Sequence, residues 1–158
     1  MNKIVVGTIS FLAGSILGGY KVAELCERAL KIEEKRAEKN GVNFKTSCKW
    51  IQSYQSCKRI GNYLKKKEIK EVAVYGMGEL GKCLIKALED ENITVKYVID
   101  RNNYRAFGTY LCYSPLDALP EVQAIIITPV SDYNNIAKQL EEKINASLIS
   151  LDHMIDEL

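Results

Sequence analysis

Hydrophobic and polar positions follow three successive patterns along this chain of 158 residues. Residues 4–20 contain no charged residue, and a lysine lies on each side of them. Between residues 21 and 40, apolar residues recur at steps of three and four among charged ones, which predicts a helix. From residue 71 onward, short apolar runs alternate with amphipathic stretches, which predicts strands separated by helices.

Residues 4–20 are predicted to be a transmembrane segment. As a helix they extend over about 25 Å, slightly less than the hydrocarbon core of a bilayer, which is about 30 Å thick. A secretory signal peptide is the alternative, but no clear small-x-small cleavage site follows the apolar run. Basic residues gather after the segment, which predicts an N-terminus outside the membrane and a cytoplasmic C-terminal domain. They are Lys21, Arg28, Lys31, Lys35 and Arg36.

Two sets of positions in the N-terminal helix predict a homodimer. The first set is spaced four residues apart and lets a second backbone approach closely; it consists of Ser10, Gly14 and Gly18. The second set forms an apolar seam of two heptads; it consists of Val22, Leu25, Ala29 and Ile32. Two heptads are short for a stable coiled coil, so a monomeric stalk is the alternative.

The predicted organisation is a transmembrane anchor over residues 1–20, a helical stalk and linker over 21–41, and an α/β domain with a leading helix over 42–158. The stalk is expected to end at Asn40-Gly41, where periodicity is lost. Predicted strands cover 71–75, 93–99, 109–114, 124–129 and 147–151, with helices between most of them. Such apolar strands indicate a Rossmann-like parallel sheet of about five strands in the order 3-2-1-4-5.

The segment GMGELG, residues 76–81, lies between a predicted strand and a predicted helix. Gly76 permits a tight turn, Gly78 lets the backbone approach a pyrophosphate, and Gly81 lets the helix pack on the strand. The free N–H groups at the helix start favour phosphate oxygens. The segment therefore predicts a nucleotide site, in which Met77, Glu79 and Leu80 complete the turn.

Residues after the second and fourth strands complete the predicted site. Asp100 follows the glycine turn by 19 residues and is suited to accept hydrogen bonds from ribose hydroxyls. Its charge favours NAD over NADP, although the neighbouring Arg101 weakens that preference. Thr128, Pro129 and Ser131 are expected to line the opposite wall; helix capping by Ser131 or Asp132 is the alternative.

Composition gives no argument for a further ligand class. Lys and Arg total 22 against 20 Asp and Glu, and this balance does not indicate a nucleic-acid partner. The five cysteines include no CxxC pair, and the only histidine is His153, so neither a zinc site nor a disulfide framework is predicted. No catalytic residue is identified, and the sequence leans against an enzyme.

The segments YGMGELGKCLIKAL, VKYVIDRN and DALPEVQAIIIT resemble the nucleotide-binding Rossmann domain of bacterial surface-polysaccharide proteins over residues 70–155. The relatives include the N-terminal domain of sugar acyltransferases and the cofactor domain of membrane-bound capsular nucleotide-sugar dehydratases. The resemblance implies that NAD(H) or a nucleotide-sugar binds at Gly76, Gly78, Gly81 and Asp100. It also implies a glycan-biosynthesis enzyme as partner and, with the apolar segment, contact with lipid of the inner or plasma membrane of a bacterium.

These observations predict a nucleotide-binding module that is accessory to surface-glycan biosynthesis. One alternative is an NAD-dependent oxidoreductase or nucleotide-sugar enzyme that works with a partner. The other is a structural adaptor that binds no ligand.

Overall fold

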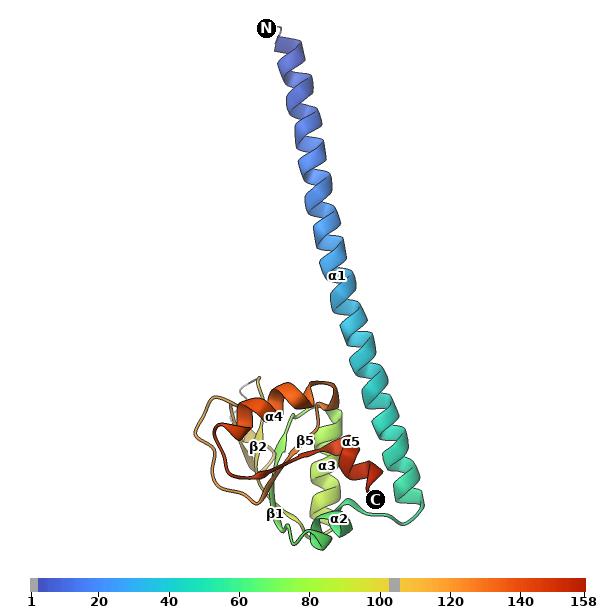
Figure 1. Cartoon of the computed structure of the whole chain (residues 1–158), viewed down its shortest axis with the longest axis vertical. Coiled ribbons are helices and arrows are strands. Elements are labelled where there is room, and N and C mark those ends of the chain that lie inside the picture. The colour runs from blue at the N-terminus through green and yellow to red at the C-terminus, as the bar shows by residue number, and fades with distance from the viewer. Residues whose placement is uncertain (1–2, 103–105) are drawn as a thin grey trace. The chain divides into compact units, whose positions relative to one another are not determined.

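The computed structural model describes the backbone of residues 3–102 and 106–158, and the side chains of residues 20–102 and 108–158. The chain divides into two compact units, Met1–Asn40 and Gly41–Leu158. The first helix, α1 (Lys3–Gln55), begins in the first unit and ends in the second (Figure 1). The predicted helix end at Asn40-Gly41 is therefore wrong, because α1 continues through both residues.

The predicted membrane localisation is also wrong. Among the described residues, no helix combines the length and the apolar character that crossing a membrane requires. The predicted segment itself, residues 4–20, has a described side chain only at Tyr20. From Lys21 onward α1 carries lysine, arginine and glutamate, and such charges are costly in hydrocarbon. A single-pass protein of the inner or plasma membrane, with its N-terminus outside, is thus not supported. The predicted packing face at Ser10, Gly14 and Gly18 lies outside the described side chains.

The second unit is built on a parallel sheet. Its five parallel strands lie in the order β4-β2-β1-β5-β6, which confirms the predicted order 3-2-1-4-5. Their bounds are β1 (Glu71–Tyr75), β2 (Thr94–Ile99), β4 (Tyr110–Tyr113), β5 (Ala124–Ile127) and β6 (Ser147–Ser150). A two-residue strand, β3 (Ala106–Phe107), pairs antiparallel with β4 at one edge.

Helices cover both faces of this sheet, as the apolar strands predict (Figure 1). One face packs against α2 (Ile60–Lys66), α3 (Glu79–Asp90) and α5 (Leu151–Asp156). The other packs against α4 (Tyr133–Glu141), which follows the short helix η1 (Val130–Asp132). Because side chains alternate along a strand, Val74 of β1 joins the first core while Tyr75 joins the second.

The order of the strands fixes where a ligand site can lie. The chain leaves β1 into α3 on one face and leaves β5, through η1, into α4 on the other. Since β1 and β5 are neighbours, their carboxyl ends form the switch point of the sheet. The glycine turn follows β1 directly, so it lies at this point.

Candidate functional site

Gly76 begins the turn, and its conformation and surroundings both require glycine. Its φ is +94°, a value that L side chains rarely adopt. A Cβ there would lie 2.7 Å from Thr128 Oγ1 and 2.8 Å from Pro129 Cδ. Its amide donates a hydrogen bond to Ile99 O at 2.8 Å, which ties the turn to β2.

Gly81 is required by the packing of α3 on the turn. A Cβ at this position would lie 1.9 Å from the carbonyl oxygen of Gly76. Because that oxygen belongs to the backbone, no side-chain movement can relieve the contact. Gly81 therefore allows the close helix–strand approach that the sequence predicts.

Gly78 differs from the other two glycines, because nothing in the structure requires it. It is the exposed N-cap residue of α3, with φ −71° and ψ −173°, which any residue can adopt. A Cβ there would meet nothing within 4 Å. The first hydrogen bond of α3 runs from the amide of Lys82 to Gly78 O at 3.1 Å. The preceding amides of Glu79, Leu80 and Gly81 thus have no intrahelical acceptor, and Gly78 has no side chain to cap them.

Asp100 lies directly beneath the turn and holds it. One carboxylate oxygen accepts a hydrogen bond from the amide of Met77 at 2.7 Å, and the other accepts from the amide of Asn102 at 2.8 Å. Only 9% of the residue is exposed. The Met77 side chain points into the core, so this residue contributes its backbone to the turn. The structure thus brings Asp100 to the glycine turn.

The other predicted wall residues have separate roles. Thr128 is buried, and its hydroxyl lies 3.0 Å from Tyr75 O and 3.1 Å from Gly76 O, so it supports the turn from below. Ser131 is exposed in η1. Arg101 points toward η1, where its Nη2 lies 2.9 Å from Asp132 Oδ2.

The guanidinium of Arg101 has a second acceptor in the same place. Its Nε donates to the hydroxyl of Tyr75 at 3.3 Å. This hydrogen bond, followed by the attraction of Asp132, raises the pKa of Arg101 above its ordinary value. A guanidinium is always charged in proteins, and Asp132 compensates part of the charge of Arg101.

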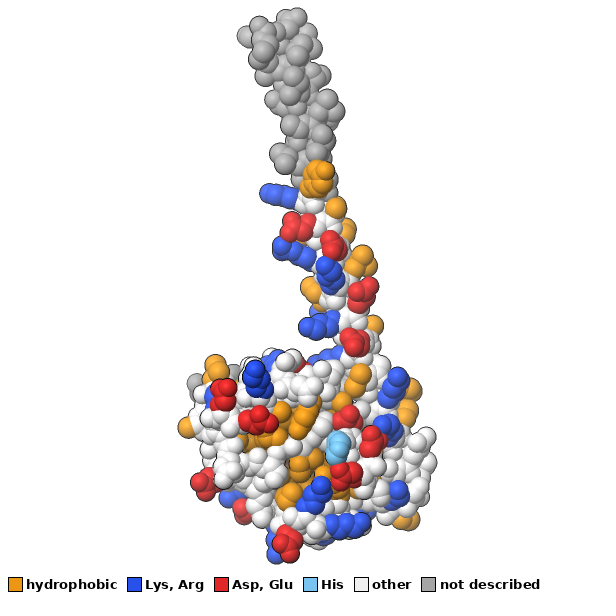
Figure 2. Space-filling model, viewed as in Figure 1, with side chains coloured by type: hydrophobic (Ala, Val, Ile, Leu, Met, Phe, Trp, Pro, Cys, Tyr) orange, Lys and Arg blue, Asp and Glu red, His pale blue; other side chains and the backbone are white. Residues whose placement is uncertain are grey.

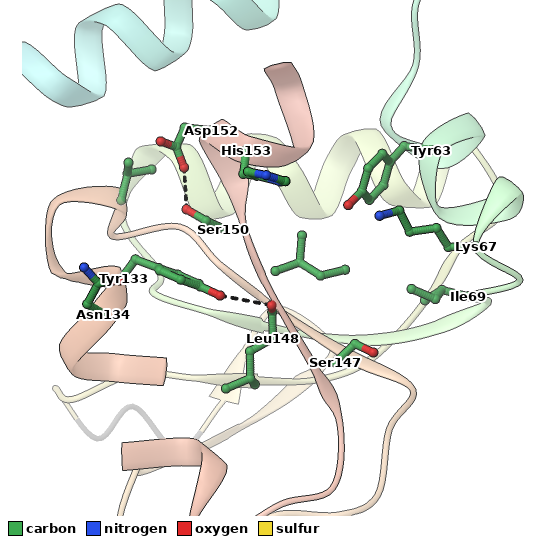
Figure 3. A pocket seen from close by; sticks show the side chains of 12 residues that line it. Tyr63, Lys67, Ile69, Tyr133, Asn134, Ser147, Leu148, Ser150, Asp152 and His153 are labelled. Carbon is green, nitrogen blue, oxygen red and sulfur yellow. Dashed lines mark hydrogen bonds between the residues drawn. The ribbon is translucent and has the colours of Figure 1, made fainter. Parts of the chain in front are cut away.

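A groove of about 700 Å³ runs along β6 at the edge of the sheet, and no residue of the glycine turn is among those that line it (Figure 3). The hydroxyl of Tyr133 donates to Leu148 O at 3.1 Å, and Ser150 Oγ donates to Asp152. Lys67 Nζ lies 4.6 Å from the ring centroid of Tyr63, and contact with Tyr63 raises the pKa of Lys67.

Sequence reasoning missed this groove, because its walls come from segments far apart in the chain. They are residues 63–69, 130–134 and 147–153. A usable local signal was the spacing of Tyr63 and Lys67, four residues apart at the end of one helical pattern. His153 also lines the groove; its Nδ1 lies 3.1 Å from Glu157 Oε1, and its side chain is 68% exposed.

Comparisons with other proteins add no identification. No family model, curated protein or solved structure matches the chain. The resemblance to the nucleotide-binding domains of bacterial surface-polysaccharide proteins therefore stays a prediction. Within the described part of the chain, no group of three or more His, Cys, Asp or Glu side chains is placed to hold a metal ion.

Proposed function

We propose that the second unit binds a nucleotide, either NAD(H) or a nucleotide-sugar, with its phosphates at the start of α3. The observation that supports this most directly is the open space at Gly78. Packing accounts for Gly76 and Gly81, but it does not account for a glycine at the N-cap, where Ser, Asp or Asn would stabilise the helix by a few tenths of a kcal/mol more. A phosphate that approaches the backbone closely explains why position 78 carries no side chain.

The amides at the start of α3 supply the binding chemistry. Three N–H groups precede the first intrahelical hydrogen bond, and the helix adds a partial positive charge at the same end. These donors belong to a stretch of backbone that Asp100 and Thr128 hold in place. Binding a ligand there therefore costs little conformational entropy.

Asp100 is also positioned for the ribose. Each of its oxygens accepts one backbone hydrogen bond, and a carboxylate has about four acceptor positions in total. Capacity therefore remains for ribose hydroxyls. Its negative charge repels a 2′-phosphate. Arg101 could attract such a phosphate, but its ion pair with Asp132 weakens that attraction. The proposal is thus NAD rather than NADP among the dinucleotides.

The unit then serves as a binding module, and an enzyme of surface-glycan biosynthesis is its proposed partner. A structural adaptor without ligand is the second candidate. It is favoured by one observation, namely that both oxygens of Asp100 already hold backbone amides. On that view the acid and the glycines serve only to build the turn.

Calorimetric titration of the full chain with NADH, NADPH and UDP-glucose separates the two candidates. We expect NADH or UDP-glucose to bind, and we expect Gly78→Asp to weaken that binding about tenfold or more, because a carboxylate would occupy the phosphate donors and repel the ligand. Gly41→Asp is the matched control, since Gly41 is also exposed and also offers open space to a Cβ. The absence of binding at millimolar concentration, or equal weakening by both substitutions, would support the adaptor instead.

A further inference from the structure

The stretch of α1 between residues 20 and 36 carries apolar side chains that the protein itself does not cover. Val22 is 60% exposed, Leu25 63% and Ile32 53%, and Ala29 is exposed as well. Figure 2 shows hydrophobic side chains at the surface of the helical stretch outside the globular part, among charged ones. These four residues follow one another at steps of three, four and three, so they lie along one side of the helix. Isolated helices in water derive little stability from propensity alone, so such a stripe calls for a partner.

Charged side chains flank this stripe in an ordered way. If the heptad is written abcdefg with Val22 at a and Leu25 at d, then Ala29 and Ile32 occupy the next a and d positions. The g positions hold Lys21, Arg28 and Lys35, all of them basic, and Glu33 occupies an e position. Charges at e and g set the choice and orientation of a partner helix.

We propose that this stripe is a parallel dimer interface with a second copy of the chain. In a parallel pair, a g residue faces the e residue of the following heptad on the partner helix, so Arg28 of each copy faces Glu33 of the other. In an antiparallel pair, g residues face each other, and basic residues would meet along the seam. Charge complementarity therefore selects the parallel arrangement. In the first heptad, Val22 at a and Leu25 at d form the combination that favours two strands.

Within a single copy, the charged residues beside the stripe form exposed ion pairs that can be exchanged for ion pairs with a second helix. Arg28 Nη2 pairs with Glu24 one turn earlier, and Arg36 Nη1 lies 2.7 Å from Glu33. Both pairs are highly exposed, so each side chain can turn to the opposite charge on a second helix at little cost. Beyond Ile32 the next a and d positions are Arg36 and Lys39, where the apolar seam ends. The proposal is independent of nucleotide binding by the second unit.

Leu25 and Leu30 provide a matched test, because their exposures are 63% and 65% and only Leu25 lies on the seam. Sedimentation equilibrium of the full chain should show a dimer for the parent and for Leu30→Lys. Leu25→Lys should raise the dissociation constant about tenfold or more. A monomeric parent at micromolar concentration, or the same effect from both substitutions, would overturn the proposal. Large assemblies whose size Leu25→Lys does not change would also overturn it.

A charge exchange tests the orientation separately. Arg28→Glu and Glu33→Arg should each weaken the dimer, and the double variant should restore it. Within one helix, the double variant still places like charges one turn apart, because the new carboxylate lies near Glu24 and the new guanidinium lies near Arg36. Recovery therefore reports only contact between copies. Failure to recover would exclude the parallel register.

Discussion

Gly78 and Gly81 lie three residues apart in one turn, yet their substitution should act in opposite directions. In Gly78→Ser the hydroxyl can accept from the amides of Leu80 or Gly81, so we expect a gain of about 0.3 kcal/mol in the free energy of unfolding. The same hydroxyl occupies the phosphate donors, so nucleotide affinity should fall. In Gly81→Ala the methyl group meets Gly76 O at 1.9 Å, and we expect a loss of about 2 kcal/mol or more.

Urea unfolding followed by circular dichroism measures both effects, and titration with NADH or UDP-glucose measures the affinity. Gly78→Ser that gains stability without losing affinity would place the ligand elsewhere. Gly81→Ala with unchanged stability would show that the backbone of the turn can move aside.

At the residue scale, the sequence predicted which residues lie together at the glycine turn, but not all of the hydrogen bonds that they make there. Gly76, Gly81 and Asp100 do come together, because the pattern of strand, glycines, helix and distant acid fixes that geometry. The hydrogen bonds of Asp100 to the amides of Met77 and Asn102 could not be read from the pattern, since they depend on the path of the loop. The same is true of Thr128, whose hydroxyl lies under the turn.

At the element scale, Gly41 decides whether α1 is continuous in solution. It lies inside the helix, is exposed, and offers open space to a Cβ. We expect Gly41→Ala to raise the free energy of unfolding by about 0.5–1 kcal/mol and to increase the helical signal in circular dichroism. Gly108→Ala is the control: it also has open space, but its φ of +58° disfavours alanine, so stability should fall. If Gly41→Ala gives no gain, the helix does not continue through residue 41.

The boundaries of helices were the weakest part of the sequence prediction. Asn40-Gly41 carries the signal of a helix end, yet one glycine costs only about 1 kcal/mol in a helix. Packing beyond it compensates, because Thr46 is buried and Trp50 packs against the core. The real end comes after Gln55, where Cys57 has φ +59°. A cysteine is not a typical residue for that conformation, so nothing in the sequence indicated the break between α1 and α2.

At the scale of the whole molecule, the parallel sheet could be predicted because it follows from patterns that repeat. All four residues of β5 are buried, as expected for a central strand covered on both faces. No repeating pattern in the sequence predicts the groove along β6. It arises where Tyr63, Tyr133 and His153 meet at a sheet edge, and only the assembled fold brings them there.

The stability of the second unit should decrease at alkaline pH, and Tyr97 is a main cause. Burial, with a further contribution from Tyr113, raises the pKa of Tyr97 to about 12. An unfolded tyrosine loses its proton near pH 10, so the unfolded state is favoured progressively as pH rises from about 10 toward 12. Tyr110, with a pKa also raised to about 12 by burial and by Glu89, adds an effect of the same sign.

Tyr97→Phe separates this effect from general alkaline damage. The hydroxyl of Tyr97 donates to Pro120 O at 2.7 Å, so its removal should cost about 1 kcal/mol at neutral pH. Between neutral pH and about pH 11, however, the variant should lose less stability than the parent, because it no longer carries the buried hydroxyl. Urea unfolding at both pH values measures the difference, and Tyr20→Phe, with its side chain exposed on α1, is the control. Equal alkaline losses in the parent and in Tyr97→Phe would mean that other groups control the transition.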